Sequence, residues 1–491
     1  MPLILGTNSI KDSTFSVANS CRFNDDDSPS MTKASTTVTD DKKFTISAWC
    51  KRGNMGDGSG NEFGIFGHRS NSNNGNNNLQ FGFYQDHIYC AFVSNNGSDV
   101  HINKVSDALY QDPTAWYHVM LAVDTTQGTA ANRNRIYVNG TEVTSFSTDT
   151  NAPSDRTFLN DACNIDVGRY TNTGGTNFEF DGYLAEVVYI DGLQLTPSSF
   201  GEFNEDSPTI WQPKDVSGLT FGNNGFYLDF EDSSNLGNDA NGGTDLTESN
   251  LDATDQSTDT CTNNYATLNP LNVPTSNAPT FAEGSLFGES VTGGTSSVAF
   301  GGSSTFGLTQ GKWYLEAKCG SSTSRDAIGV TGEASECART NNSGISRTNS
   351  SFLYSGETGT VYVNSSSTSY GNTFGNNDII GVALDLDNLK VYFSKNGTWQ
   401  NSGDPTSGST GTGAISITSV SSTTDGAYFI NHGSTAGGGA PSGKSVFNFN
   451  FGNPPFTISS GNSDGNGYGN FEYSVPSGYY ALNSKNLAEY G

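Results

Sequence analysis

Two acidic residues of this chain stand at a spacing that could support hydrolysis. Glu179 and Asp181 lie two residues apart in a stretch that is typical of a β-strand, so alternation would place both carboxylates on one face. A pair of this kind can act as nucleophile and acid in the cleavage of a glycosidic bond. The alternative is an ordinary closing strand with no catalytic role.

A second acidic group has the chemistry of a calcium site. Asp25, Asp26 and Asp27 form the densest acidic turn in the first part of the chain, and Asp124 ends a predicted core strand. Calcium prefers six to eight oxygen ligands, which carboxylates and carbonyls supply. These four residues are the candidate metal ligands, although their spacing is not that of an EF-hand and a solvated turn would explain them equally.

Aromatic and amide side chains at predicted strand ends form a third group. Tyr84, His87, Tyr170 and Asn172 lie at strand–loop junctions of the first part of the chain. A sugar site needs an aromatic surface for the ring and nearby polar groups for the hydroxyls, which makes carbohydrate the favoured ligand class. The alternative for each ring is simple packing in a sandwich.

Composition excludes several classes of function. The 491 residues carry a net charge of −27, and no basic stripe could neutralise nucleic acid or an anionic membrane. The seven cysteines are sparse and show no CxxC spacing, so neither zinc nor a disulfide framework is predicted. No apolar run is long enough for a membrane span or for a signal peptide, which predicts assembly in a cytoplasm without export by the secretory route.

The elements that must position these residues are almost all strands. Phe44, Ile46, Ala48 and Cys50 alternate with other residues, as one buried face of a strand would. Two strand runs end in Asn-Gly, at Asn139-Gly140 and Asn396-Gly397, the dipeptide that favours a tight hairpin. The helical period is nearly absent, so the predicted fold class is all-β with very little helix.

The first part of the chain resembles laminin-G-like domains of the concanavalin type. The resemblance is carried by SAWCKR at 47–52, by WYHV at 116–119 with YVNG at 137–140, and by FDGYLAEVVYIDG at 180–192. It implies a jelly-roll β-sandwich. Concanavalin-type glucanases carry a third acid on the strand that holds the catalytic pair, whereas Tyr183 and Leu184 stand at the corresponding positions of this chain. We therefore expect no enzyme, with a polysaccharide-degrading hydrolase as a remote alternative.

The last part of the chain resembles the SPRY fold. The matching motifs are GKWYLE at 311–316, IGV at 328–330, DIIGVALDLD at 378–387 and VYFSKNG at 391–397. SPRY domains bind partners through loops at one edge, which makes Tyr370 and Trp399 the candidate ligand-binding residues of this part. The predicted organisation is a laminin-G-like sandwich over 1–225, a returning strand and connector over 226–279, and a SPRY-like sandwich with a C-terminal extension over 280–491.

The whole chain resembles virion structural proteins of marine tailed bacteriophages. The similarity lies in MPLILG at the start, SSNLGNDA at 233–240, NNYATLNPL at 263–271 and the ending YALNSKNL at 480–487. It implies a non-enzymatic tail fibre or tail-associated adhesin, present in many copies or as a homo-oligomer. Such a protein would contact other virion proteins and a host-surface glycan or glycoprotein. A capsid decoration or head-fibre protein is the alternative.

Overall fold

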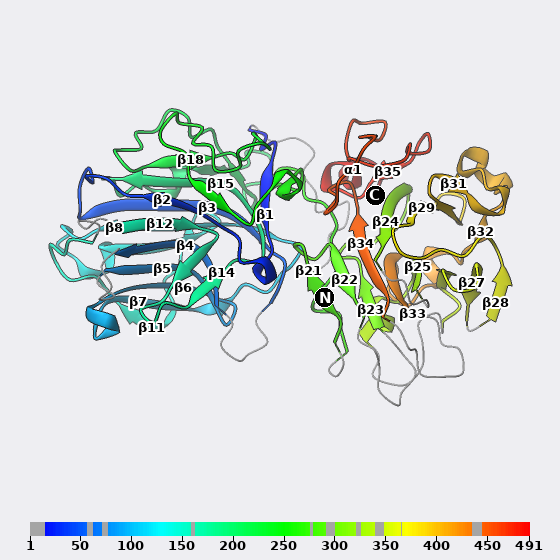
Figure 1. The fold of residues 1–491 in the computed structure, drawn as a ribbon, viewed down its shortest axis with the longest axis horizontal. Coiled ribbons are helices and arrows are strands. Elements are labelled where there is room, and N and C mark those ends of the chain that lie inside the picture. Colours follow the sequence, from blue (N-terminus) through cyan, green and yellow to red (C-terminus); the bar gives the residue numbers. More distant parts are fainter. Residues whose placement is uncertain are drawn as a thin grey trace. The chain divides into compact units, whose positions relative to one another are not determined.

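A computed structural model gives the fold of two separate compact units. It describes residues 15–55, 62–70, 77–158, 163–274, 278–290, 300–320, 326–338, 348–364, 366–434 and 444–491. The chain divides between Thr262 and Asn263, and we call the part before this point the first unit and the part after it the second unit. Both are built from strands (Figure 1).

The first unit is a sandwich of two sheets, named here after their central strands. The β3 sheet contains, in order, β10 (Thr141–Glu142), β9 (Asn134–Val138), β8 (Trp116–Asp124), β3 (Lys43–Arg52), β15 (Gly182–Asp191), β1 (Ser20–Phe23) and β20 (Gln256–Ser257), with β18 (Phe226–Leu228) also paired to β15. The β5 sheet contains β11 (Phe146–Thr150), β7 (Asp99–Leu109), β6 (His87–Ser94), β5 (Asn78–Tyr84), β4 (Glu62–Ser70), β12 (Cys163–Val167), β2 (Ser30–Ala34) and β19 (Thr247–Ser249). Two short hairpins, β13 (Arg169–Thr171) with β14 (Asn177–Glu179) and β16 (Gly201–Phe203) with β17 (Trp211–Pro213), stand outside these sheets.

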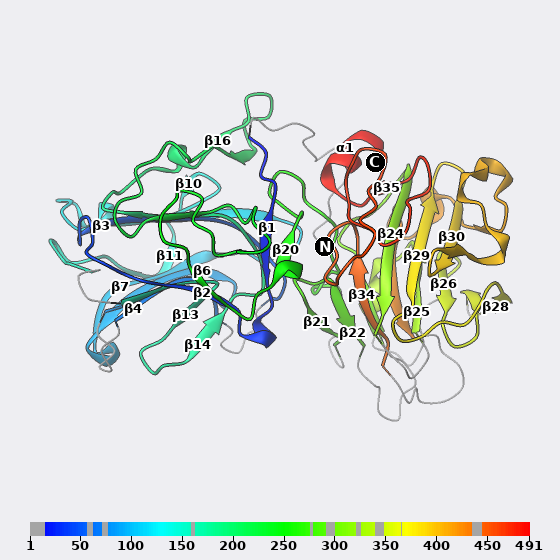
Figure 2. The ribbon, with the colours of Figure 1, turned by 45° about the horizontal axis from the view of Figure 1, so that its top comes forward.

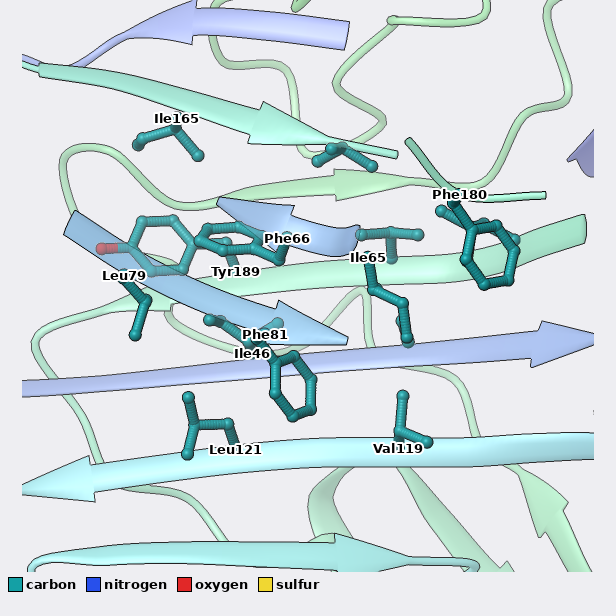
Figure 3. Close-up of a cluster of buried hydrophobic side chains, with 14 of the residues drawn as sticks. Ile46, Ile65, Phe66, Leu79, Phe81, Val119, Leu121, Ile165, Phe180 and Tyr189 are labelled. Atoms are coloured by element: carbon teal, nitrogen blue, oxygen red, sulfur yellow. The ribbon is translucent and has the colours of Figure 1, made fainter. Parts of the chain in front are cut away.

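The core of the first unit lies between these two sheets. Phe44, Ile46, Ala48 and Cys50 are fully buried, which confirms the predicted alternation of β3. From the other sheet, residues such as Leu79 and Phe81 point toward them (Figure 3). Because alternate residues of a strand face opposite sides, the residues between these face away from this core.

Residues 226–262 complete the first unit, and the returning strand predicted at the start of this segment is present as β18. β18 pairs with β15, β19 pairs with β2, and β20 pairs with β1. The segment therefore adds three strands to the edges and face of the first sandwich. The division of the chain thus falls at 262/263, and not at 225 and 280 as expected from the sequence, because these short strands carry no strong alternation of their own.

The second unit is also a sandwich of two sheets. The β24 sheet contains β21 (Thr280–Ala282), β22 (Phe287–Glu289), β34 (Val446–Asn450), β24 (Lys312–Cys319), β29 (Ile379–Asp385), β30 (Lys390–Lys395) and β31 (Thr398–Trp399), with β32 (Ile415–Ser416) paired to β30 and β35 (Tyr480–Ala481) to β24. The β25 sheet contains β23 (Phe300–Ser303), β33 (Phe429–Ser434), β25 (Asp326–Thr331), β26 (Ser351–Ser355), β27 (Thr360–Val363) and β28 (Ser366–Ser369).

Helix is scarce in the described residues, as predicted. The α-helix α1 covers Ser484–Tyr490. Single 3-10 turns occur at η2 (Asp25–Asp27), η3 (Asn95–Gly97), η4 (Ala130–Asn132), η5 (Pro197–Ser199), η6 (Ala253–Asp255), η7 (Ala334–Ala338), η8 (Gln400–Ser402), η9 (Pro405–Thr410) and η10 (Val420–Ser422). Within the described ranges, no helix has the length and apolar character that a membrane crossing requires.

Both predicted Asn-Gly hairpin turns are present. Asn139 and Gly140 have φ values of 48° and 75°, and Asn396 and Gly397 have the same two values. Two consecutive positive φ angles define the type I′ turn, which matches the twist of paired strands. The expectation of an all-β protein with two sandwiches in series is confirmed.

Candidate functional site

The β5–β6 hairpin carries two of the predicted ligand-binding residues. Tyr84 ends β5 and His87 begins β6, and they are paired across the hairpin. The two turn residues between them, Gln85 and Asp86, both have positive φ, at 48° and 66°. Residues of such a pair project to the same face, so Tyr84 and His87 lie together on the side of the β5 sheet that faces away from the core.

An arginine from the opposite sheet fixes this hairpin turn. Arg52, at the end of β3, places Nη1 at 2.7 Å from Asp86 Oδ1 and donates from the same nitrogen to the Tyr110 carbonyl at 2.8 Å. Its guanidinium lies 4.6 Å from the ring centre of Phe83 and is buried. The ion pair therefore crosses the end of the sandwich and holds the turn that presents Tyr84 and His87.

Tyr89 lies beside this pair on the same face. It is paired with Gly82 of β5, which in turn is paired with Gly64 of β4, so two neighbouring positions on this face have no side chain. The Tyr89 ring lies 5.8 Å from that of Tyr84, and its hydroxyl donates to Gln80 Oε1 at 2.9 Å. Burial raises the pKa of Tyr89, so the phenol stays protonated and remains a hydrogen-bond donor.

The β13–β14 hairpin forms a wall against β4, on the side of the β5 sheet away from the β3 sheet (Figure 2). A Cβ atom added to Gly64 would lie 2.3 Å from the Tyr170 backbone nitrogen, and one added to Gly67 would lie 2.8 Å from the Tyr170 Cα. The two glycines are thus required for the close approach of this hairpin. The Tyr170 hydroxyl donates to Glu62 Oε2, and burial raises the pKa of Tyr170.

These contacts define a face that we call the tyrosine face, formed by Gln80, Tyr84, His87, Tyr89 and Asn103. Asn103 belongs to it because it is paired with Ala91, two residues after Tyr89 on β6. All of them except Gln80 are partly exposed. Two aliphatic side chains of β7, Leu109 and Val100, continue the face and are 53% and 48% exposed. Rings, amides and hydroxyls on an open apolar strip are the groups that a sugar ring requires.

The structure brings only some of the predicted site residues of the first unit together. Tyr84 and His87 are on the tyrosine face. Tyr170 borders it but is fully buried, so its ring supports the wall and offers no surface to a ligand. Asn172 lies at the tip of the β13–β14 hairpin, where its Oδ1 accepts a hydrogen bond from Thr176 N at 3.0 Å, the geometry of a turn. Sequence reasoning missed Tyr89, because β6 is apolar on both faces and its alternation does not show which side is buried.

The carboxylate pair does not form a hydrolytic site. The predicted strand is interrupted, since β14 ends at Glu179 and β15 begins at Gly182. Asp181 is 2% exposed, next to the turn of Asp25, whose side chain is hydrogen bonded to it. Glu186 lies further along β15 at a bulge with φ of 50°, and its Oε2 accepts from the Tyr227 hydroxyl at 2.8 Å. Glu179 and Asp181 therefore do not lie on one continuous strand, as a pair of catalytic acids on one strand face would require.

The four proposed calcium ligands cannot share one ion. Asp25, Asp26 and Asp27 form η2, which directly follows β1 beside Gly182 and Arg52. Asp124 is paired with Lys43 at the other end of the ten-residue β3, about 30 Å away at the usual rise of a strand. Its carboxylate instead accepts from Thr126 and Gln127 in a turn. Across the described ranges, no three His, Cys, Asp or Glu residues are grouped as ligands of a metal.

The two candidates of the second unit are packed. Tyr370 is 5% exposed, and its hydroxyl accepts from Phe393 N at 3.1 Å, while its ring meets the Tyr354 ring at 5.6 Å. Trp399 is half-buried against the rings of Tyr314 and Tyr392, at 6.4 and 6.5 Å. Tyr370 is therefore packed in the core and presents little surface, and Trp399 presents only part of its ring.

The C-terminal extension covers the outer face of the β24 sheet, where Trp399 lies. Phe471 packs on Tyr314 with ring centres 5.1 Å apart. The fully buried Glu316 accepts hydrogen bonds from the backbone nitrogens of Glu472 and Tyr473, at 2.9 and 2.8 Å. The extension is thus held by a buried carboxylate, whereas Tyr84 stays partly exposed among the residues that the structure describes.

Comparison with known proteins identifies the type of both sandwiches. Residues 25–197 match the Concanavalin A-like lectin/glucanases superfamily, and residues 312–415 match the SPRY domain. The chain therefore contains a concanavalin-like domain followed by a SPRY domain. The first match suggests carbohydrate binding. A search of curated proteins gave no match.

Several solved structures are similar in part. A native heptameric SAP-like pentraxin from Limulus polyphemus is 17% identical over 37% of this chain and 80% of its own, with a TM-score of 0.28. A putative carbohydrate binding protein from Bacteroides ovatus ATCC 8483 is 19% identical over 48% of this chain and 58% of its own, with a TM-score of 0.30. A human SPRY domain is 13% identical over 33% of this chain and 90% of its own, with a TM-score of 0.23.

Proposed function

We propose that the first unit binds carbohydrate through the tyrosine face, without cleaving it. The observation that carries this proposal is the cluster of partly exposed Tyr84 and Tyr89 rings, 5.8 Å apart, on a hairpin held by the buried Arg52–Asp86 ion pair. Preorganised rings lose little conformational freedom when a sugar packs on them, which favours binding. The match to the concanavalin A-like lectins supports the ligand class.

The ligand class that fits this face best is a neutral glycan. The net charge of the chain is −27, and the carboxyl of Glu62, hydrogen bonded to Tyr170, is a negative group that acts on Tyr89. Sulfated, sialylated or phosphorylated sugars would meet an unfavourable potential here. Uncharged hydroxyl groups can pair with the Glu62 carboxylate, the Asn103 amide and the Tyr84 hydroxyl.

The biological setting that we propose is a tail fibre or tail-associated adhesin of a phage virion. The support is the resemblance of the chain to marine phage structural proteins. An individual sugar site is weak, so many copies on one particle, or a homo-oligomer, would raise the avidity by orders of magnitude. The protein would be assembled in the host cytoplasm and would meet other virion proteins and the host-surface glycan or glycoprotein.

A second candidate role is capsid decoration or a head fibre. It is favoured by the sequence, which contains neither a heptad shaft nor a β-helix repeat of the kind found in long fibres. In this role the loops of the two domains would hold neighbouring virion proteins, and the tyrosine face would have no host ligand.

Adsorption competition separates the two roles. Purified protein is incubated with host cells, and phage attachment is then measured with and without calcium. We expect wild-type protein to block attachment and the Tyr89→Ala variant to block it poorly, with no effect of calcium. Absence of both cell binding and blocking, in a folded sample of native oligomeric state, would contradict the adhesin role. Release of reducing sugar from host polysaccharide would contradict binding without cleavage.

A further inference from the structure

The first unit contains a lysine and an aspartate that are buried in contact with each other. Lys51 Nζ lies 2.7 Å from Asp259 Oδ2, and the two side chains are 1% and 0% exposed. Lys51 is on the outer side of β3, while Asp259 is 208 residues further along the chain, directly after β20. Burial lowers the pKa of Lys51, which favours the uncharged and nucleophilic amine.

Aromatic side chains surround this pair. The Trp116 indole donates from Nε1 to Asp259 Oδ1 at 3.1 Å, so it holds the carboxyl oxygen that does not face the lysine. Lys51 Nζ lies 5.7 Å from the ring centre of Tyr183, and the carboxyl of Asp112 is the further charge that acts on the lysine. The Lys51 amine therefore lies at Oδ2 of the Asp259 carboxyl, and the Trp116 N–H is held at Oδ1. Aromatic rings pack around the two groups.

The other lysine–carboxylate contacts of the first unit lack these properties. Lys42 and Asp155 lie 3.1 Å apart, but their side chains are 32% and 66% exposed. Lys33 and Asp239 are buried, but the Nζ–Oδ2 distance is 4.0 Å. The buried contact of Arg52 with Asp86 involves a guanidinium, which stays protonated and is not a nucleophile.

Asp259 lies near the end of the first unit, so a covalent bond to its side chain would fix that end. The Ser20 hydroxyl donates to the Asp259 carbonyl at 2.6 Å, and the Val17 nitrogen donates to Thr262 Oγ1 at 3.0 Å. The end of the first unit is thus held beside its beginning by noncovalent contacts, which include the Arg22–Asp255 ion pair at 3.7 Å. A covalent bond from Asp259 to β3 would tie the end of the unit directly to the centre of the β3 sheet.

We propose that Lys51 and Asp259 form an intramolecular amide bond in the mature protein. Within the buried pair, a proton passes from the ammonium to the carboxylate. The amine lone pair then attacks Asp259 Cγ, the Nζ–Cγ bond forms, and the Cγ–Oδ2 bond breaks. Oδ2 leaves as water with two of the protons that the ammonium carried, so the reaction is a condensation without oxidant or cofactor. The Trp116 N–H stabilises the negative charge that develops on Oδ1 during the attack.

The mass of the denatured wild-type protein tests this proposal. We expect a mass lower than that of the sequence by one water, and after proteolysis a branched peptide that joins Lys51 to Asp259. The Lys51→Arg variant keeps a cation beside Asp259 but cannot form the bond, and it should show the full mass. Trp116→Phe should form the bond more slowly, which leaves a mixture of both masses.

The alternative outcomes overturn the proposal. A wild-type protein of full mass would show that the pair remains ionic. A loss of one water in both the wild type and Lys51→Arg would point to dehydration at an Asp-Gly sequence such as Asp191-Gly192, and not to this pair. Because the decisive measurement uses the wild-type protein, it does not depend on the folding of any variant.

Discussion

The outer faces of the two sandwiches both carry clustered tyrosines, but in the described parts of the chain their exposure differs. Tyr84 and Tyr89 on the β5 sheet are partly exposed beside Leu109, which is 53% exposed. Tyr314 and Tyr392 on the β24 sheet are at most 1% exposed, under the C-terminal extension. The same residue type thus forms a candidate ligand surface in one unit and a second hydrophobic core in the other.

The difference in exposure of these tyrosines follows from the polar side chains that lie beside them in the two units. In the second unit, the buried Glu316 accepts from two backbone nitrogens of the extension, and Asp464 accepts from Ala481 N at 2.9 Å and Asn486 Nδ2 at 2.7 Å. In the first unit, the buried Arg52 fixes the turn of the β5–β6 hairpin through Asp86 and also donates to the Tyr110 carbonyl. Among the described residues, polar anchors thus hold another segment over the tyrosines of the β24 sheet, whereas Tyr84 and Tyr89 stay partly exposed.

The largest loss of stability is expected from substitution of Arg52, which holds the hairpin that carries the tyrosine face. Arg52→Met leaves the buried Asp86 carboxylate without its cation, so we expect the free energy of unfolding of the first unit to fall by about 4 kcal/mol. Glycan binding should weaken at temperatures where the unit is still folded, because the turn that holds Tyr84 is released. Denaturant titration and glycan binding measure the two effects. The exposed Lys42→Met is the control and should change stability by less than about 0.5 kcal/mol; similar losses for both variants would contradict this role of Arg52.

Substitution of Glu316, which holds the C-terminal extension, should expose the outer face of the β24 sheet in the second unit. Glu316→Ala leaves the backbone nitrogens of Glu472 and Tyr473 unpaired, and we expect a loss of about 3 kcal/mol in the stability of the second unit. Protease cleavage within the extension should become faster, while glycan binding by the first unit stays unchanged. Glu289→Ala, at a partly exposed ion pair, is the matched control. An extension that remains resistant to protease would show that Glu316 does not hold it.

A smaller effect is expected from the half-buried ring of the covered face. Trp399→Ala removes contacts with Tyr314 and Tyr392, and because the ring is only partly buried we expect a loss of about 2 kcal/mol in stability. Glycan binding should be the same as in the wild type. Thermal unfolding and glycan binding of the same sample test both statements. A loss of binding without a loss of stability would move the sugar site to the second unit.

The buried carboxyl of Glu186 predicts a pH dependence of the stability of the first unit. Burial raises the pKa of Glu186 to about 8, with one hydrogen bond from Tyr227 and the negative charges of Asp229 and Glu231 nearby. A raised folded-state pKa means that the folded protein holds a proton that the unfolded chain has released. Its stabilising contribution is therefore complete below the usual glutamate range and is lost as the pH rises toward 8, by at most about 1.4 kcal/mol per pH unit.

The Glu186→Gln variant should remove this dependence. It should be more stable than the wild type at pH 8 and should lose less stability between pH 5 and pH 8. Denaturant titrations of both proteins across this range provide the measurement. Parallel pH profiles would mean that Glu186 is ionised in the folded protein.

The sequence predicts the fold of this chain better than its site. The hairpins at Asn139-Gly140 and Asn396-Gly397 and the buried face of β3 follow from local residue types, and all are present. Tyr84 and His87 lie at strand–loop junctions, as local residue types predict. Glu62 could not be foreseen, because its contact with Tyr170 joins residues 108 positions apart.

The site predictions that the structure does not support depend on contacts between residues far apart in the sequence. Tyr370 has the sequence surroundings of a loop aromatic, but Tyr354 and Phe393 enclose it. Asp124 ends a strand as predicted, but the length of β3 separates it from η2. Neither fact is contained in local alternation, since both depend on which strands become neighbours.

Glycan binding by two paired variants is the most direct test of the central claim. Wild-type protein, Tyr89→Ala and Trp399→Ala are compared on neutral host-surface glycans, each at a temperature where it is folded. We expect Tyr89→Ala to bind at least about tenfold more weakly, because the ring that faces the sugar is lost, and Trp399→Ala to bind as the wild type does. Equal binding by wild type and Tyr89→Ala, or a loss of binding only in Trp399→Ala, would contradict the assignment of the site to the tyrosine face.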